Sequence, residues 1–153
     1  MAAGLYPAEQ ALITLGAAVG GIAKSYGTAQ WFDQILPVEL PCLIVIPSTK
    51  EAGAWGTSAF LGNAAKHQFG LEHWLLYRQI DATPTDRTTL MPSLLQLIDS
   101  YLAVLATRPF IGSDLSAPPI HQTPKVVYGT GTLPWGEGRY HGVVFKYQLE
   151  VNL

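Results

Sequence analysis

The amino-acid sequence predicts an α+β domain in which two helices pack on one face of an antiparallel or mixed sheet of about four strands. Apolar residues recur at helical spacing in two separate segments, within residues 12–26 and 94–105, and these predict the helices. Residues 143–153 place apolar side chains at every second position, which predicts a strand with one wet face. Because no internal repeat or composition break is visible, we expect residues 1–153 to form a single domain.

The first helix is predicted from about Pro7 to Tyr26, since proline suits a first helical turn and Gly27 is typical of a C-terminal cap. Three glycines inside it each disfavour a helix by about 1 kcal/mol relative to alanine. They indicate either close packing of another backbone or a poorly ordered helix. The apolar stripe consists of Leu12, Leu15, Val19, Ile22 and Tyr26.

A short apolar segment, Leu43–Ile46, follows and predicts a buried strand, because it is rich in β-branched residues. Pro37 and Pro41 bracket a turn before it, and Pro47 ends it. Residues 48–65 are rich in Gly, Ser, Thr and Ala, which predicts a long exposed loop or a flexible hairpin arm.

Residues 66–80 predict a long strand that is covered on both sides. Trp74, Leu76 and Ile80 lie on one face of it. The other face carries Phe69, Leu71, His73, Leu75 and Tyr77.

The second helix is predicted to start near Thr89 as N-cap, which places Pro92 at the third helical position, where no backbone donor is needed. Pro109 ends the helix, and the proline-rich residues 108–124 predict an irregular connection. The apolar stripe of this helix is Leu94, Leu97, Ile98, Tyr101, Leu102 and Leu105.

The C-terminal strand needs a partner, and Lys125–Tyr128 is the expected antiparallel neighbour. Gly129 to Gly138 would join the two strands. This glycine-rich segment predicts either a flexible connection or a contact loop with Trp135 at its tip, and both readings stay open.

The composition favours a protein with a partly protein-covered surface and disfavours nucleic-acid-binding, secreted and membrane proteins. Hydrophobic residues make up 48% of the chain and charged residues 13%, against roughly 25% charged in ordinary soluble domains, so some of the surface is expected to face protein. The net charge is −2 and the nine Lys and Arg are scattered, which disfavours sequence-specific binding of nucleic acid. The N-terminus lacks the basic region of a secretory signal, and its apolar stretch is too short for a membrane span, so we expect a soluble protein made in a cytosol.

The residues with chemical potential do not converge in the sequence. Cys42, the only cysteine, lies in an apolar run where a buried, inert thiol is expected. His67 and His73 would lie about 20 Å apart on one strand, too far to share a metal. The carboxylate pairs, Asp81 with Asp86 and Glu137 with Glu150, are typical of solvated turn or edge charges.

We therefore predict no catalytic residue, no metal and no cofactor, and a protein that is not an enzyme. The glycine-rich segments lack the Gly-Lys-Ser/Thr ending of a phosphate loop, and no serine lies in a Gly-x-Ser-x-Gly elbow. The alternative, a small-molecule enzyme or binding domain, would need a deep pocket that holds Asp81, Asp86 or a histidine.

Several segments together resemble a known family. These are Gly21–Tyr26, the Leu36-Pro37 to Leu40-Pro41 segment, the strand entered through Pro41, the leucine-rich second helix and the closing segment Arg139–Val151. In this order they resemble the tail terminator and related neck or tail-completion proteins of long-tailed bacteriophages. The resemblance spans nearly the whole chain and rests on the order of elements and short motifs.

The resemblance implies a structural virion protein that is assembled in the host cytoplasm. It would form a ring, usually a hexamer, that caps the tail tube, ends its polymerisation and joins the head-closure or connector protein. DNA would pass through the ring without being read. Residues 50–65 match no motif of the family and could form an arm that reaches a neighbouring ring. A head-closure or tail-tube subunit is the rival reading, which the low charge and the glycine-rich segments also permit. A tube protein would polymerise without limit, whereas a terminator should stop at a closed ring.

Four residues are predicted to make contacts between subunits. Trp55, Phe60 and Trp135 are large apolar groups inside glycine-rich segments, a position typical of interface anchors. Arg139, which opens the closing segment of the resemblance, completes the set.

Overall fold

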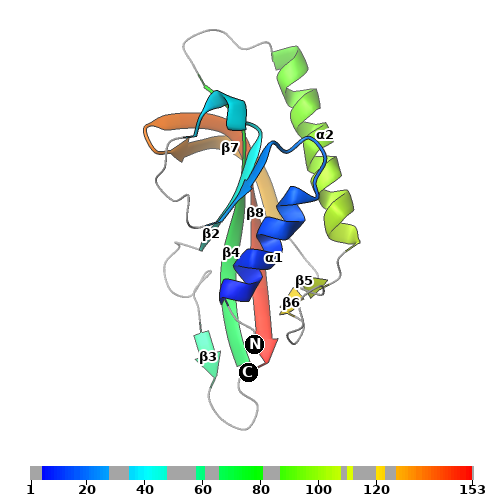
Figure 1. Ribbon diagram of the computed structural model, residues 1–153, viewed down its shortest axis with the longest axis vertical. Helices are drawn as coiled ribbons and strands as arrows, with labels where there is room; N and C mark the ends of the chain where they lie inside the picture. The colour runs from blue at the N-terminus through cyan, green and yellow to red at the C-terminus, as the bar shows by residue number, and fades with distance from the viewer. Residues whose placement is uncertain are drawn as a thin grey trace.

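Two long antiparallel strands, β4 (Lys66–Gln79) and β8 (Gly138–Asn152), run through the centre of the sheet (Figure 1). The structure is a computed structural model that describes residues 5–27, 35–47, 58–60, 66–80, 87–107, 110–111, 120–122 and 127–152. Both strands alternate apolar side chains between their two faces, and so the sheet they organise is covered on both sides.

The sheet is mixed, which is one of the two predicted arrangements. On one side of β4 lies β2 (Cys42–Pro47), antiparallel to it, and β1 (Lys24–Tyr26) pairs with β2 in parallel. On the other side of β8 lies β7 (Val127–Trp135), antiparallel to its first half. The short strands are β3 (Ser58–Phe60) on β4, β6 (Ile120–Gln122) on β8, and β5 (Phe110–Ile111) on β6.

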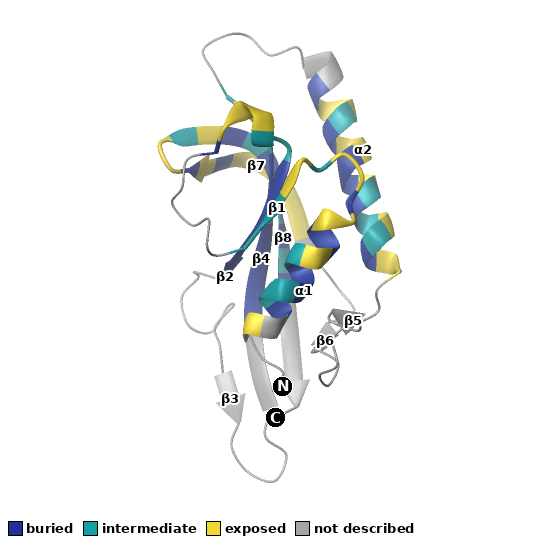
Figure 2. Ribbon diagram, viewed as in Figure 1, coloured by how far each residue is buried: buried dark blue, intermediate teal, exposed yellow. Residues whose placement is uncertain are grey.

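Both helices, α1 (Leu5–Ala17) and α2 (Arg87–Ala106), pack on the same face of the sheet, which confirms the predicted layers. Figure 2 shows the buried side of each helix turned toward the strands. The predicted stripe of α2 is buried except for Leu102, which is partly buried. On the sheet, this larger core consists of Leu43, Val45, Leu71, Leu75, Val143, Phe145 and Tyr147.

The helix boundaries differ from the prediction. α1 ends at Ala17 rather than Tyr26. The chain then turns through Gly21, whose φ of 89° is left-handed and therefore suits glycine, and enters β1 at Lys24, so the helix cannot continue to Tyr26. Gly16, inside the helix, is explained by close packing, since a Cβ there would lie 2.6 Å from the Ser25 hydroxyl of β1. α2 begins at Arg87, so Pro92 lies in its second turn, where it is exposed.

Two segments predicted to be irregular contain strands. Gly129 to Gly138 is not a flexible connection: β7 continues to Trp135, and a tight turn through Gly136, with a φ of 59°, leads directly into β8. The glycines hid this strand because they favour strands weakly, and pairing with β8 overrides that preference. Residues 108–124 include β5 and β6, which are too short to leave a pattern. Of the predicted arm, β3 is described and the rest lies outside the described residues.

The second face of the sheet carries a smaller core. Trp135 of β7 lies edge-on against Trp74 of β4, with ring centroids 6.2 Å apart. The hairpin of β7 and β8 therefore folds over the face that the helices leave open. The buried members of this core are Ile35, Cys42, Ile44, Ile46, Leu76, Leu133, Trp135 and Tyr140.

Gly142 of β8 lies where the backbone of β4 leaves no room for a side chain. The register shifts between Leu76 and Arg78 of β4, opposite this glycine. A Cβ at Gly142 would lie 2.0 Å from the Leu75 carbonyl oxygen, which belongs to the backbone and cannot rotate away. The bulge in β4 thus requires a residue without a side chain at position 142.

We expect Gly142→Ala to lower the free energy of unfolding by about 3 kcal/mol, because the two central strands must separate to admit the methyl group. Gly131→Ala is the matched control. Gly131 pairs with Gly142 in the β7–β8 register, and a Cβ there would meet no atom within 4 Å. The control should change stability by about 0.5 kcal/mol or less in urea denaturation. Equal losses in the two variants would show that the approach at Leu75 is not limiting.

Candidate functional site

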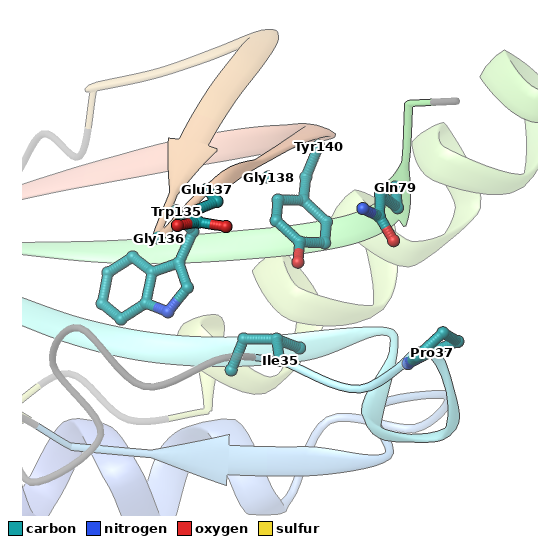
Figure 3. A pocket seen from close by; sticks show the side chains of 8 residues that line it. All are labelled: Ile35, Pro37, Gln79, Trp135, Gly136, Glu137, Gly138 and Tyr140. Atoms are coloured by element: carbon teal, nitrogen blue, oxygen red, sulfur yellow. The ribbon is translucent and has the colours of Figure 1, made fainter. Parts of the chain in front are cut away.

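A hollow of about 730 Å³ lies on the face of the sheet opposite the helices, beside the turn that joins β7 to β8. In Figure 3 the Trp135 and Tyr140 side chains form one wall, Ile35 and Pro37 lie opposite them, and Gln79 lies at one end. The lining is completed by Gly136, Glu137 and Gly138.

A short 3-10 turn, η2 (Pro37–Glu39), forms the rim of this hollow and, with the residue before it, presents three exposed apolar side chains. Leu36 is 52% exposed and Val38 is 81% exposed, and Pro37 between them is exposed as well. We call Leu36, Pro37 and Val38 the apolar knob. Exposed large apolar side chains on adjacent residues are typical of a surface that another protein covers.

Glu39 holds the apolar knob in one conformation. The Leu36 backbone N–H donates to Glu39 Oε2 at 2.6 Å, and the Tyr26 hydroxyl of β1 donates to Glu39 Oε1. The hydrogen bond from Tyr26, and then that from Leu36, lower the pKa of Glu39. The same bond to the carboxylate raises the pKa of Tyr26 to about 12. Because the carboxylate joins η2 to β1, the knob is held against the sheet and is not a free loop.

The hollow does not bring acid and base groups together. Of the residues that line it, Glu137 is the one carboxylate, and it is exposed. Burial raises the pKa of Tyr140, which disfavours the phenolate that a general base would need. Among the described residues, no group of three or more His, Cys, Asp or Glu side chains could hold a metal ion. Asp81 and Asp86 lie outside the described residues, so their place is not tested.

The other reactive residues fit structural roles. Cys42 is fully buried, as predicted, and burial raises the pKa of its thiol to about 12, which keeps it protonated and inert. His73 is also buried, under the helices. His141 lies half-buried on β8. The side chains of His67 and His121 lie outside the described residues.

The predicted contact residues meet different outcomes. Trp135 does not lie at an exposed tip, one of the two readings left open above: its side chain is 6% exposed, because β7 extends to it and folds it onto Trp74. Arg139 is exposed on β8, and its carbonyl accepts the Ile80 N–H. Phe60 lies on β3, but its side chain is not described, and Trp55 lies outside the described residues.

Sequence reasoning missed the apolar knob. Leu36 and Val38 flank Pro37 in the turn that ends at Pro41, and apolar residues in such a proline-rich turn have no partner on a strand or helix face. That pattern was the available signal. The pattern predicts exposed Leu36 and Val38 side chains only if the turn faces outward. That orientation depends on the hydrogen bonds of Glu39 to Tyr26 and Leu36.

A chain of buried hydrogen bonds joins α2 to the sheet. His73 Nδ1 lies 2.8 Å from the Tyr101 hydroxyl of α2, and that hydroxyl is hydrogen-bonded to the Tyr147 hydroxyl of β8. Tyr101 also stacks on Phe145, with ring centroids 3.8 Å apart. Burial lowers the pKa of His73 from 6.5 to about 3, because the imidazolium would lose its water without gaining a carboxylate in the described part of the chain.

His73 binds a proton near pH 6.5 in the unfolded chain but only near pH 3 in the folded chain. Above pH 6.5 it is neutral in both states and does not affect the pH dependence of stability. As the pH falls from 6.5 toward 3, protonation of the unfolded chain lowers the free energy of unfolding by up to about 1.4 kcal/mol per pH unit. We expect His73→Gln to flatten the decline in unfolding free energy between pH 6.5 and 4.5, measured by urea denaturation. Tyr101→Phe is the control, because it breaks the hydrogen bond yet leaves His73 buried. It should lower stability at every pH and keep the slope, whereas an unchanged slope in His73→Gln would contradict this account.

No model of a known protein family matches the chain, and a comparison with curated proteins finds no match. Within the described residues, neither helix has the length and apolar character required to cross a membrane.

Proposed function

We propose that this chain is a structural virion subunit of the tail-terminator type. Copies would assemble into a ring, usually a hexamer, that caps the tail tube of a long-tailed phage, ends tube growth and joins the head connector. Tail tube protein and connector protein are then its partners, and DNA passes through the lumen without sequence-specific contacts. The proposal starts from the order of elements in the sequence, and the apolar knob is the observation that supports an assembly role.

The apolar knob supports assembly because its exposure is built into a rigid element. A flexible apolar loop would lose conformational freedom on binding, whereas η2 is already held by the bonds of Glu39. A closed ring needs a protruding surface on each subunit that fits a different surface on the next. The knob suits the protruding role, since Val38 is 81% exposed. The low charged fraction of 13% also favours a chain whose surface is largely covered in its assembled state.

The first test is the mass of the purified protein in solution, by light scattering over a range of concentrations, with and without tail tubes. A discrete ring, or a smaller species that forms one when it meets tubes, is the expected result. Open-ended fibres would assign the chain to a tube subunit, and a monomer or dimer that ignores tubes would reject the proposal.

The second test removes the apolar knob. Val38→Gln should leave the free energy of unfolding unchanged and raise the dissociation constant of the ring at least about tenfold, because burying a valine side chain contributes about 1.5 kcal/mol. Leu95→Gln is the matched control: Leu95 is 51% exposed on α2, which packs on the opposite face of the sheet. Equal weakening in both variants would mean that the knob has no special part in the contact.

A further inference from the structure

The outer edge of β7 is open: among the residues that the structure describes, β8 is the one strand that pairs with β7, and no strand pairs with its other edge. β7 has nine residues, which is long for an edge strand, and Tyr128, Gly129, Thr130, Gly131 and Thr132 are all exposed. A long open edge of this kind is a template for pairing with another chain.

One hydrogen bond identifies which residues of β7 face outward. The Arg139 carbonyl accepts the Ile80 N–H, so the backbone groups of Arg139 face β4 and not β7. Pro134, its register partner, therefore directs its backbone groups away from β8, which fits a residue without an N–H. Because the direction alternates along a strand, Thr132, Thr130 and Tyr128 also direct their N–H and C=O outward.

This edge lacks most of the protection that edge strands carry. No residue from Val127 to Trp135 is charged, and Pro134, at one end, is the one proline in the strand. β1, the outermost strand beyond β2, contrasts with it: it has three residues, and Lys24 among them is exposed. The sheet can therefore be extended at β7, and β1 offers a poor second edge.

We propose that β7 pairs antiparallel with β7 of a second copy of this chain, about a two-fold axis at Thr130. The three outward residues are symmetric about Thr130, so Tyr128 of each copy would lie opposite Thr132 of the other. All of their outward donors and acceptors are then satisfied, and Pro134 falls beyond the paired segment. The edge carries no charge, so two identical edges meet without repulsion.

This contact is independent of the proposed ring. A ring joins two different surfaces of each subunit, whereas a two-fold contact uses one surface twice. A variant that lacks the ring contact would therefore still form a dimer. The apolar knob and the β7 edge can therefore be tested in separate variants.

Disulfide cross-linking tests the register. Across the two-fold axis the Cα atoms of two Thr130 residues would lie about 5.5 Å apart, within reach of a disulfide. We expect Thr130→Cys to form a cross-linked dimer on oxidation, detected on a non-reducing gel, and Cys42 to stay out of it because it is buried. Thr132→Cys is the matched control, since its two thiols would be about 14 Å apart. Absence of the Thr130→Cys cross-link, or an equal cross-link in the control, would overturn the proposal.

Thr130→Pro tests the edge without a cysteine. The Thr130 N–H faces away from β8, so proline there removes no bond within the subunit, as Pro134 already illustrates in the same strand. The variant should keep its unfolding midpoint, and the dissociation constant of the dimer from sedimentation should rise at least about tenfold. An unchanged dissociation constant would reject the β7 contact.

A double variant separates this contact from the ring. When Val38→Gln is combined with Thr130→Cys, the chain should still form the disulfide-linked dimer on oxidation, because the apolar knob takes no part in the pairing of β7. Loss of the cross-link in the double variant, with the fold retained, would contradict the independence of the two surfaces.

Discussion

The pairing of β4 with β8 is the constraint on which the other elements depend. Each strand places one set of side chains toward the helices and the alternate set toward the smaller core on the opposite face, so a shift by one residue would exchange the two cores. The bulge after Leu76 and the missing side chain at Gly142 bring the backbones close at one point. The register of the central pair is thereby linked to a single position.

The helix face gains specificity from polar atoms as well as from apolar area. His73, Tyr101 and Tyr147 come from β4, α2 and β8, and their hydrogen bonds require all three elements to be in place at once. Burial keeps His73 neutral, and in the described residues its Nε2 has no hydrogen-bond partner. An unpaired buried nitrogen lowers stability. The hydrogen bonds among His73, Tyr101 and Tyr147 therefore specify the position of α2 at some cost in the free energy of unfolding.

The sequence predicted what long periodic patterns determine. The apolar stripe of α2, the two faces of β4 and the alternation of β8 are predicted from patterns of ten or more residues. The structure has the first two, and it has the alternation of β8 from Val143 to Tyr147, where the side chains are described. Sequence reasoning missed the features that depend on one neighbouring strand or one side chain. β1 exists because β2 offers it an edge, and β7 continues through Gly129 and Gly131 because β8 is long enough to pair with them. The exposed knob depends on one carboxylate, Glu39, which propensity cannot identify.

Trp135 joins the two proposed contact surfaces, although its own role differs from the one predicted. Its ring and that of Tyr140 form a wall of the hollow beside the apolar knob, and its packing on Trp74 holds the end of β7 on the sheet. Leu133 is buried in the same core, so one face of β7 is fixed at this end while Tyr128, Thr130 and Thr132 stay exposed. Because one end of β7 is anchored in this way, less entropy is lost when a second strand pairs with its edge. The aromatic residue expected to touch a partner is therefore better explained as the support that keeps the contact edge in place.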